Sequence, residues 1–293
     1  MTTSTPICPC SALAAGFWSH GRLADCPVID MHGHLGAVNG IWFPRGEIAS
    51  MIQSMDAAGV RLLVFAPHAS LCCPDIGNRA AVEAVRQFPG RLRAYLSVNP
   101  HYPDDLGRDL EALEAQRDVF VGLKLLASYH GVPIAEAPYR RALEFADQRG
   151  LPVLLHTWGG DRCAGEAQVR KVAERYPRAQ WLLGHSLHGQ WEEAAALARQ
   201  FPHVWLELTA VLGFHGILET FVERGCGQRL LFGTDLPWFS PHHGIGAVLS
   251  ADITDDDRRD ILYRNAERLL GLTAGQPVGS PLPVFPSVPH KPQ

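Results

Sequence analysis

Two histidines one residue apart, His32 and His34, end the short apolar stretch 27–34. If this stretch is a β-strand, alternate side chains share a face, so both imidazoles and the carboxylate of Asp30 point the same way. Two imidazoles on one face can bind one metal ion. Gly33 lies between them and lets another backbone segment or a ligand come close. The pair alone is weak evidence, because 14 histidines in 293 residues produce this spacing by chance.

Further polar side chains lie at or near the ends of later apolar stretches: Lys124 in GLKL, His156 in VLLHTW, His185 in LLGHS and Asp235 in FGTDLPW. A random placement of histidines would rarely select so many of these ends. Neutral imidazoles together with a carboxylate suit zinc, with manganese or iron as alternatives. A water bound to such an ion is a usable nucleophile near neutral pH. The pattern therefore predicts one bound divalent metal ion.

The stretches that carry these residues alternate with amphipathic segments. We expect strands at 27–34, 60–66, 93–98, 119–126, 153–156, 180–185, 204–208 and 229–232. We expect helices at 48–58, 78–87, 106–116, 136–148, 165–176, 190–200 and 217–224, with a last helix from 254 to 271. Strands that alternate with helices predict a parallel sheet, and eight such units favour closure into a single α/β barrel of the (β/α)8 TIM type. The polar residues at the strand ends would then face one site at the carboxyl end of the barrel.

The chain divides into a leader at 1–26, the barrel at 27–272 and a Pro-rich tail at 273–293. The formal net charge of −4 and the ordinary share of apolar residues give no indication of nucleic acid or an anionic membrane as a partner. No stretch approaches the roughly 18 uninterrupted apolar residues of a membrane span. The start of the chain does not resemble a signal peptide, and the seven cysteines form no disulfide framework. These features predict a cytoplasmic protein.

The segments VIDMHGH, GLKL, VLLHTW, LLGHS and FGTDLPW, followed by ILYRNAERLLGL, occur in this order over residues 27–272. Together they resemble the amidohydrolase superfamily, and more narrowly its amidohydrolase-related branch, which includes enzymes similar to aminocarboxymuconate-semialdehyde decarboxylase. The resemblance implies that the metal ligands are His32, His34, His156 and Asp235. It also implies that His185 acts on substrate or water, and that Asp235 doubles as the base that takes the water proton.

Lys124 leaves three alternatives open. In two-metal relatives a lysine of the fourth strand is carboxylated and bridges the ions, and with His156 and His185 it would complete a second metal site. In many single-metal relatives the similar lysine is unmodified. Lys124 would then contact a substrate anion or support a ligand, or it would form a structural ion pair.

Aromatic residues and one arginine lie in the expected loops on the functional face. The candidates for substrate contact are Trp42 in the first loop, Trp158 and Arg162 in the fifth and Trp238 in the eighth. Aromatic walls with one arginine suit a flat or cyclic carboxylate. Aromatic residues in long loops also commonly just pack against each other.

The leading functional hypothesis is a hydrolase, in which metal-activated water attacks a small cyclic or carboxylate-bearing substrate and Asp235 takes the proton. The alternative is a metal-dependent, non-oxidative carboxy-lyase, which uses the same ligands and releases carbon dioxide. A third hypothesis, a barrel without enzymatic activity, is disfavoured because the ligand set is intact. The expected partner is a small molecule. The oligomeric state stays open, with a homodimer as one arrangement that the tail could serve.

Overall fold

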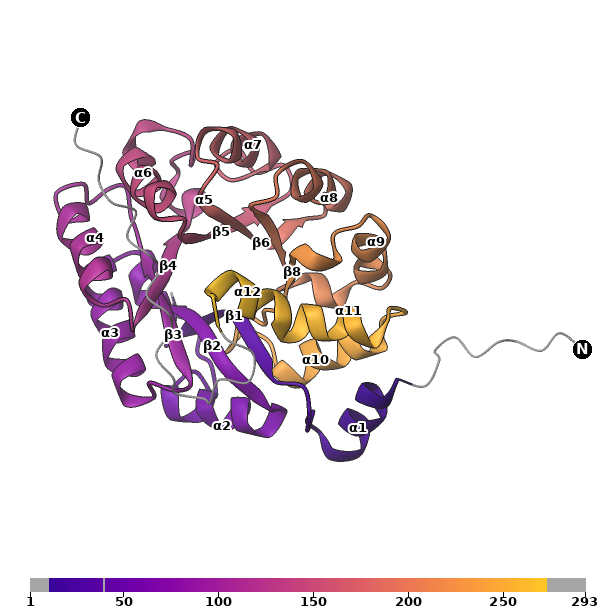
Figure 1. The fold of residues 1–293 in the computed structure, drawn as a ribbon. Helices are drawn as coiled ribbons and strands as arrows, with labels where there is room; N and C mark the ends of the chain where they lie inside the picture. The colour runs from indigo at the N-terminus through magenta and orange to yellow at the C-terminus, as the bar shows by residue number, and fades with distance from the viewer. Residues whose placement is uncertain (1–10, 39, 273–293) are drawn as a thin grey trace, which may run out of the picture.

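A computed structural model describes residues 11–38 and 40–272, so the first ten residues of the leader and the whole tail 273–293 lie outside the described residues. Eight parallel strands form one sheet in sequence order. They are β1 (Val28–Leu35), β2 (Val60–Pro67), β3 (Leu92–Ser97), β4 (Phe120–Leu125), β5 (Pro152–Trp158), β6 (Gln180–His188), β7 (Val204–Glu207) and β8 (Leu230–Leu231). Figure 1 shows the strands around the centre and the helices outside them. The predicted (β/α)8 barrel is confirmed.

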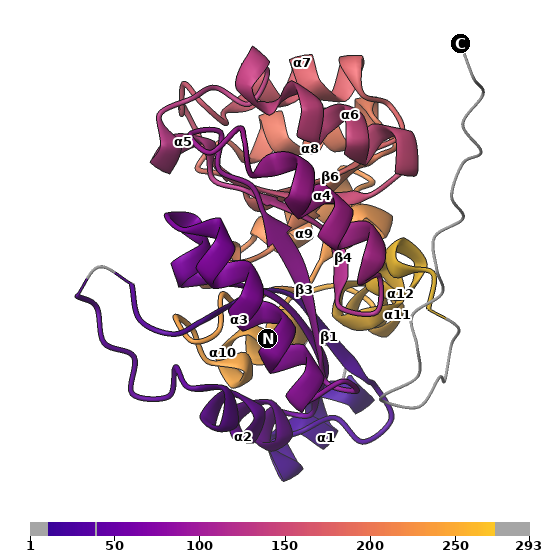
Figure 2. The same cartoon turned by 90° about the vertical axis from the view of Figure 1, so that its left-hand side faces the viewer.

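The α-helices of the described chain lie outside the ring of strands, except the last, which covers one end of the barrel with Ala266, Leu269 and Leu270 (Figures 1 and 2). They are α1 (Ala12–His20), α2 (Ile48–Ala58), α3 (Pro74–Gln87), α4 (Leu106–Ala115), α5 (Ala127–His130), α6 (Arg140–Arg149), α7 (Glu166–Arg175), α8 (Trp191–Gln200), α9 (Ile217–Glu223), α10 (Pro241–Ser250), α11 (Asp255–Arg259) and α12 (Asn265–Leu270). Among these described residues, no helix combines the length and apolar character needed to cross a lipid bilayer.

Three helical features depart from the sequence-based expectation. The leader contains α1, which begins because the Ser11 hydroxyl accepts a hydrogen bond from the backbone of Ala14, and which buries Phe17. The segment after β8 contains α10, which begins with Pro241 at its first position. The single helix expected at 254–271 is divided into α11 and α12 by a π-helical turn at Asp260–Arg264.

The barrel closes between β1 and the segment that follows β8. Backbone N–H groups alternate across this seam: Met31 donates to Phe232 at 2.9 Å, Asp235 to His32 at 2.7 Å and His34 to Leu236 at 2.7 Å. This pairing explains why β8 is shorter than the expected 229–232, since the chain leaves β7 after Leu231 to pair with β1. The same bonds bring Asp235 beside the two histidines.

The expected alternation along β1 is wrong at Asp30. Ile29 and Met31 belong to the apolar cluster inside the barrel, whereas Asp30 is in register with Leu63, a residue of the outer core between strands and helices. The register shifts between Asp30 and Gly33, and such a bulge re-aims the side chains that follow it. Asp30 therefore does not share a face with His32. Its carboxylate accepts hydrogen bonds from the backbone N–H of His32 and of Thr234, each at 3.1 Å.

Two apolar layers leave one end of the barrel for chemistry. The inner layer fills the barrel with side chains that include Met31, Val64, Tyr95 and Trp205, and the outer layer packs the strands against the helices. A filled interior cannot hold a ligand, so the site must lie at the carboxyl ends of the strands.

Candidate metal centre

Three potential metal ligands meet at the seam. Nε2 of His32 lies 3.2 Å from Oδ1 of Asp235, and Nε2 of His34 lies 3.1 Å from the same oxygen. Both imidazoles are buried. Oδ1 of Asp235 is buried too, yet neither approach has hydrogen-bond geometry and the oxygen has no such partner among the described residues. Three ligand atoms that converge without bonding each other fit a cation between them.

Hydrogen bonds on the far side of each imidazole fix which ring nitrogen is free. Nδ1 of His34 lies 2.8 Å from the carbonyl oxygen of Ala66, and Nδ1 of His32 lies 2.8 Å from a carboxylate oxygen of Glu207. Carbonyl and carboxylate oxygens only accept, so the proton of each ring is on Nδ1. The lone pair of Nε2 on each ring is then available to a metal ion.

Glu207 is a functional residue that sequence reasoning missed. It is fully buried at the end of β7 and accepts hydrogen bonds from Nδ1 of His32, from the backbone of His185 at 3.2 Å, and from the backbone and hydroxyl of Thr209 at 2.7 and 2.6 Å. His32, His185 and Glu207 could themselves form a metal-binding group. Because Glu207 uses the protonated nitrogen of His32, we interpret it as a support for that ligand. Its signal was a single charge within the apolar stretch 204–208.

Lys124 lies inside this centre. Its Nζ atom is 2.8 Å from Nε2 of His32, and the side chain is fully buried in β4. Burial lowers the pKa of Lys124 to about 8, although the carboxylates of Asp235 and Glu207 oppose the shift. The ammonium group therefore faces the same lone pair that a metal ion would use. This position brings Lys124 to the centre, and which of the three alternatives describes its role stays a prediction.

His156 and His185 pair with each other. Nδ1 of His156 lies 3.1 Å from Nε2 of His185, and Nδ1 of His185 is buried without a hydrogen-bond partner in the described structure. Burial lowers the pKa of both rings, to about 4 for His185, so both are neutral. His156 does not join the group formed by His32, His34 and Asp235. Its role as a metal ligand stays a prediction from the resemblance.

The acid–base state of Asp235 suits a ligand. Burial alone would raise the pKa of this carboxyl group, and positive charge on His32 and His34 would hold it well below its usual range. When both imidazoles are neutral, a cation between the three side chains would supply that charge. The backbone of Asp235 has a φ of 58°, which is unusual for a residue with a side chain. The group is therefore a carboxylate held in one orientation.

The four predicted substrate contacts fall into two pairs. Trp158 stacks on His188 with 4.1 Å between ring centroids and lies 5.6 Å from the ring of His185. Trp238 donates its indole N–H to Nε2 of His68 at 2.9 Å. Trp42 is 77% exposed and Arg162 is also exposed, and contact of either residue with a substrate stays a prediction.

His68, which sequence reasoning did not single out, joins three loops at the centre. Its Nδ1 donates to the carbonyl oxygen of Gly36 at 2.6 Å, while its Nε2 accepts from Trp238. Its ring stacks on His34, with 4.5 Å between centroids and 15° between planes, and also on Phe43. Burial lowers the pKa of His68 to about 4. Both ring nitrogens are occupied, so His68 positions His34 and the loops and does not bind the metal.

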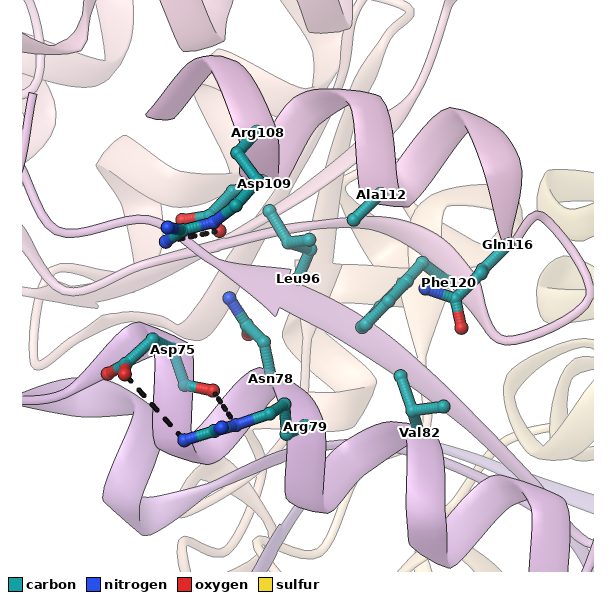
Figure 3. A pocket seen from close by; sticks show the side chains of 10 residues that line it. All are labelled: Asp75, Asn78, Arg79, Val82, Leu96, Arg108, Asp109, Ala112, Gln116 and Phe120. Atoms are coloured by element: carbon teal, nitrogen blue, oxygen red, sulfur yellow. Dashed lines mark hydrogen bonds and ion pairs between the residues drawn. The ribbon is translucent and has the colours of Figure 1, made fainter. Parts of the chain in front are cut away.

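A cavity of about 370 Å³ lies elsewhere, on the outside of the barrel between α3 and α4. Figure 3 shows apolar side chains such as Leu96 and Phe120 at its base and two Arg–Asp pairs at one end. Arg79 pairs with Asp75 at 3.8 Å, and the second pair is Arg108 with Asp109. None of the predicted site residues lines this cavity, so it is separate from the metal centre.

Fold and site together define a class of protein. It is a single (β/α)8 barrel in which a His-x-His pair on the first strand and an aspartate after the eighth strand could hold one divalent metal ion. The sequence model of the amidohydrolase family matches residues 29–272. The chain therefore belongs to the amidohydrolase family, as the sequence motifs indicated. No curated protein matches the chain.

Solved structures with this fold include three decarboxylases. The 2,6-dihydroxybenzoate decarboxylase from Rhizobium has a TM-score of 0.68 at 16% identity, covering 84% of this chain and 98% of its own. The 5-carboxyvanillate decarboxylase from Sphingomonas paucimobilis has a TM-score of 0.68 at 14% identity, covering 85% and 100%. A dihydroxybenzoic acid decarboxylase from Polaromonas, solved with manganese and the inhibitor 2-nitroresorcinol, has a TM-score of 0.69 at 17% identity, covering 84% and 97%. At these identities the likeness establishes the fold.

Proposed function

We propose that this amidohydrolase-family protein is a metal-dependent, non-oxidative carboxy-lyase that acts on a small cyclic carboxylate. The observation that carries the proposal is the position of Lys124, a buried amine directly beside the His32 nitrogen. A divalent ion on that nitrogen would displace the amine from the His32 lone pair, and a protonated Lys124 beside the ion could then pair with the same carboxylate as the ion. The decarboxylases with the same fold support the same reaction class.

The residues of the site suit the two requirements of decarboxylation. A divalent metal held by His32, His34 and Asp235 would supply positive charge for the carboxylate and for the electron pair that carbon dioxide leaves behind. Lys124 would orient the carboxylate, and Glu207 would keep His32 in position through its Nδ1 proton. The aromatic ring of Trp158 would pack against the apolar part of the substrate.

His185 is the group best placed to donate a proton. Its ring lies 5.2 Å from that of His32 between centroids, and its Nδ1 is buried with no hydrogen-bond partner in the described structure. When the bond to the carboxylate breaks and carbon dioxide leaves, the electron pair stays on the substrate carbon, which takes the Nδ1 proton of His185. In the same step Nε2 of His185 takes the Nδ1 proton of His156 across 3.1 Å and His156 takes one from solvent, so neither neutral ring becomes an anion. The partly exposed side of His156 connects this pair to solvent.

Hydrolysis is the second candidate function. The approach of both His32 and His34 to Asp235 favours it, because a carboxylate at the metal can also take a proton from an attacking water. A single metal ion at the centre is compatible with either reaction. The two reactions differ in their products.

The test is incubation of the manganese- or zinc-loaded chain with carboxyl-¹³C-labelled 2,6-dihydroxybenzoate and 2-hydroxybenzoate in D₂O. We expect labelled carbon dioxide and one deuterium on the carbon that lost it. His185→Asn should lower the rate by about 10²- to 10⁴-fold, whereas His215→Asn, at an exposed histidine, should not. Turnover of esters, lactones or amides with ¹⁸O uptake from water, and no carbon dioxide from any acid, would favour hydrolysis instead.

A further inference from the structure

A second cavity, of about 260 Å³, opens beside the metal centre. Its walls come from the end of β6, the loop after β7 and the start of α10. One wall consists of Gly233 and Thr234, the two residues directly before Asp235. Another is His188, whose ring stacks on Trp158 next to His185. The cavity therefore neighbours the side chains proposed to bind and protonate the substrate, with His188 and Trp158 stacked between it and His185.

The lining of this cavity is apolar and carries no Lys, Arg, Asp or Glu among the described residues. Phe214 and Phe239 stand at its edge with 50% and 45% of their surface exposed. Rings of this size that stay open to solvent next to a cavity are typical of a binding surface for an apolar group. The polar atoms available are the imidazoles of His188 and His243 and the hydroxyl of Ser240. They can form hydrogen bonds, and the cavity has no permanently charged side chain in its described lining to pair with a second carboxylate.

The charges of the site lie outside this cavity. Lys124, Asp235 and Glu207 gather around His32, and none of the three lines the cavity. A carboxylate in the cavity would lose its water without gaining an opposite charge, which is costly. An apolar cavity of about 150 Å³ is large enough for benzene, so this volume accommodates a ring with a substituent. No described atom lies within 4 Å of a Cβ built on Gly213, so the space there is open.

From these observations we infer that the cavity is a subsite for an uncharged aryl or alkyl group of the substrate. The inference rests on the proposed carboxylate chemistry at the metal centre. The substrate class that fits is a monocarboxylate with an apolar extension, in which the carboxylate meets the metal and the extension enters between Phe214 and Phe239. Dicarboxylates that place their second charge in the cavity are disfavoured.

The test compares ligand affinities by calorimetry on the full, manganese-loaded chain. The probes are 2-hydroxybenzoate, its 4-phenyl and 5-phenyl derivatives, and 2-hydroxyterephthalate. We expect at least one phenyl derivative to bind ten times more tightly than 2-hydroxybenzoate, and the dicarboxylate to bind more weakly than it. The double variant Phe214→Ala, Phe239→Ala should reduce the phenyl preference below threefold. Ile76→Ala removes an apolar side chain that is 52% exposed on α3 and should leave the preference unchanged.

Two results would overturn the subsite: phenyl derivatives that bind no more tightly than the parent acid, or a phenyl preference that survives the double variant. Carbon dioxide release from the same compounds separates this inference from the proposed reaction. Release without a phenyl preference contradicts the subsite alone. A phenyl preference that the double variant removes, with no release from any compound, supports the subsite and contradicts the carboxy-lyase.

Discussion

The two sides of the barrel differ in the backbone that follows their strands. On the side of β6, β7 and β8, five residues with side chains have positive φ: His185, Ser186, Leu187, Ala210 and Asp235. On the side of β1 to β5, every positive φ in the described chain belongs to glycine. The cavity on the first side has no Lys, Arg, Asp or Glu in its described lining, whereas the cavity between α3 and α4 has its charges paired with each other.

This difference shows which part of the fold contains strained backbone. A non-glycine residue in the left-handed region costs about 1 to 2 kcal/mol and persists only where its surroundings hold it. The backbone N–H of His185 is held by Glu207, and that of Asp235 by the carbonyl of His32. Strain thus lies at the residues that carry the proposed chemistry. The side of β1 to β5, where only glycine has a positive φ in the described chain, contributes Lys124 from the regular strand β4.

Replacing Glu207 gives the largest effect we expect from a single change outside the ligands. Glu207→Gln keeps the size of the side chain but points an NH₂ group at hydrogen-bond donors, so His32 loses its acceptor or the amide is left unpaired. Metal affinity should fall about 10- to 100-fold, measured by competition with a chelator. Glu267→Gln, at a buried glutamate that pairs with Arg61, is the matched control. An unchanged metal affinity in Glu207→Gln would show that the hydrogen bond between Glu207 and His32 does not contribute to metal binding.

Trp238 tests whether the loops around the site are held by His68. Trp238→Phe keeps an aromatic ring but removes the N–H that His68 accepts at 2.9 Å. The buried Nε2 of His68 loses its partner, so we expect a loss of about 1 kcal/mol in the free energy of unfolding and faster hydrogen exchange of the segment 36–46. Trp42→Phe, at a ring that is 77% exposed, should change neither quantity. Equal effects of the two variants would argue against this role of His68.

A smaller effect addresses the strain itself. Ala210 has a φ of 63° in the loop after β7, and glycine adopts this conformation without steric cost. Ala210→Gly should leave the protein equally stable or stabilise it by up to about 1 kcal/mol. The relief of backbone strain in the folded state should equal or exceed the stability lost through the greater entropy of the unfolded chain. Gly131→Ala, at a φ of 68° with open space around the new Cβ, should destabilise by about 1 kcal/mol. Urea unfolding measures both, and a marked loss of stability in Ala210→Gly would disprove the strain there.

Much of the fold and the metal centre could be predicted from the sequence because both follow local rules. The barrel is predicted by apolar stretches of strand length. The polar residues at the ends of these stretches predict that His32, His34, Asp235 and Lys124 lie together. The bulge at Asp30 could not be predicted, since it arises from pairing with a segment 204 residues away. The support by His68 likewise depends on loops that meet only in the folded chain. Glu207 could have been predicted, because it is the one charged residue in an otherwise apolar stretch.

The central claim is that His32, His34 and Asp235 hold a single divalent metal ion. The most direct measurement is the metal content of the purified chain by plasma mass spectrometry, before and after reconstitution with zinc or manganese. We predict about one equivalent, lost in the double variant His32→Ala, His34→Ala, with Lys124 unmodified by intact mass. No metal after reconstitution would contradict the metal centre, and two equivalents with a carboxylated Lys124 would contradict the single-ion site.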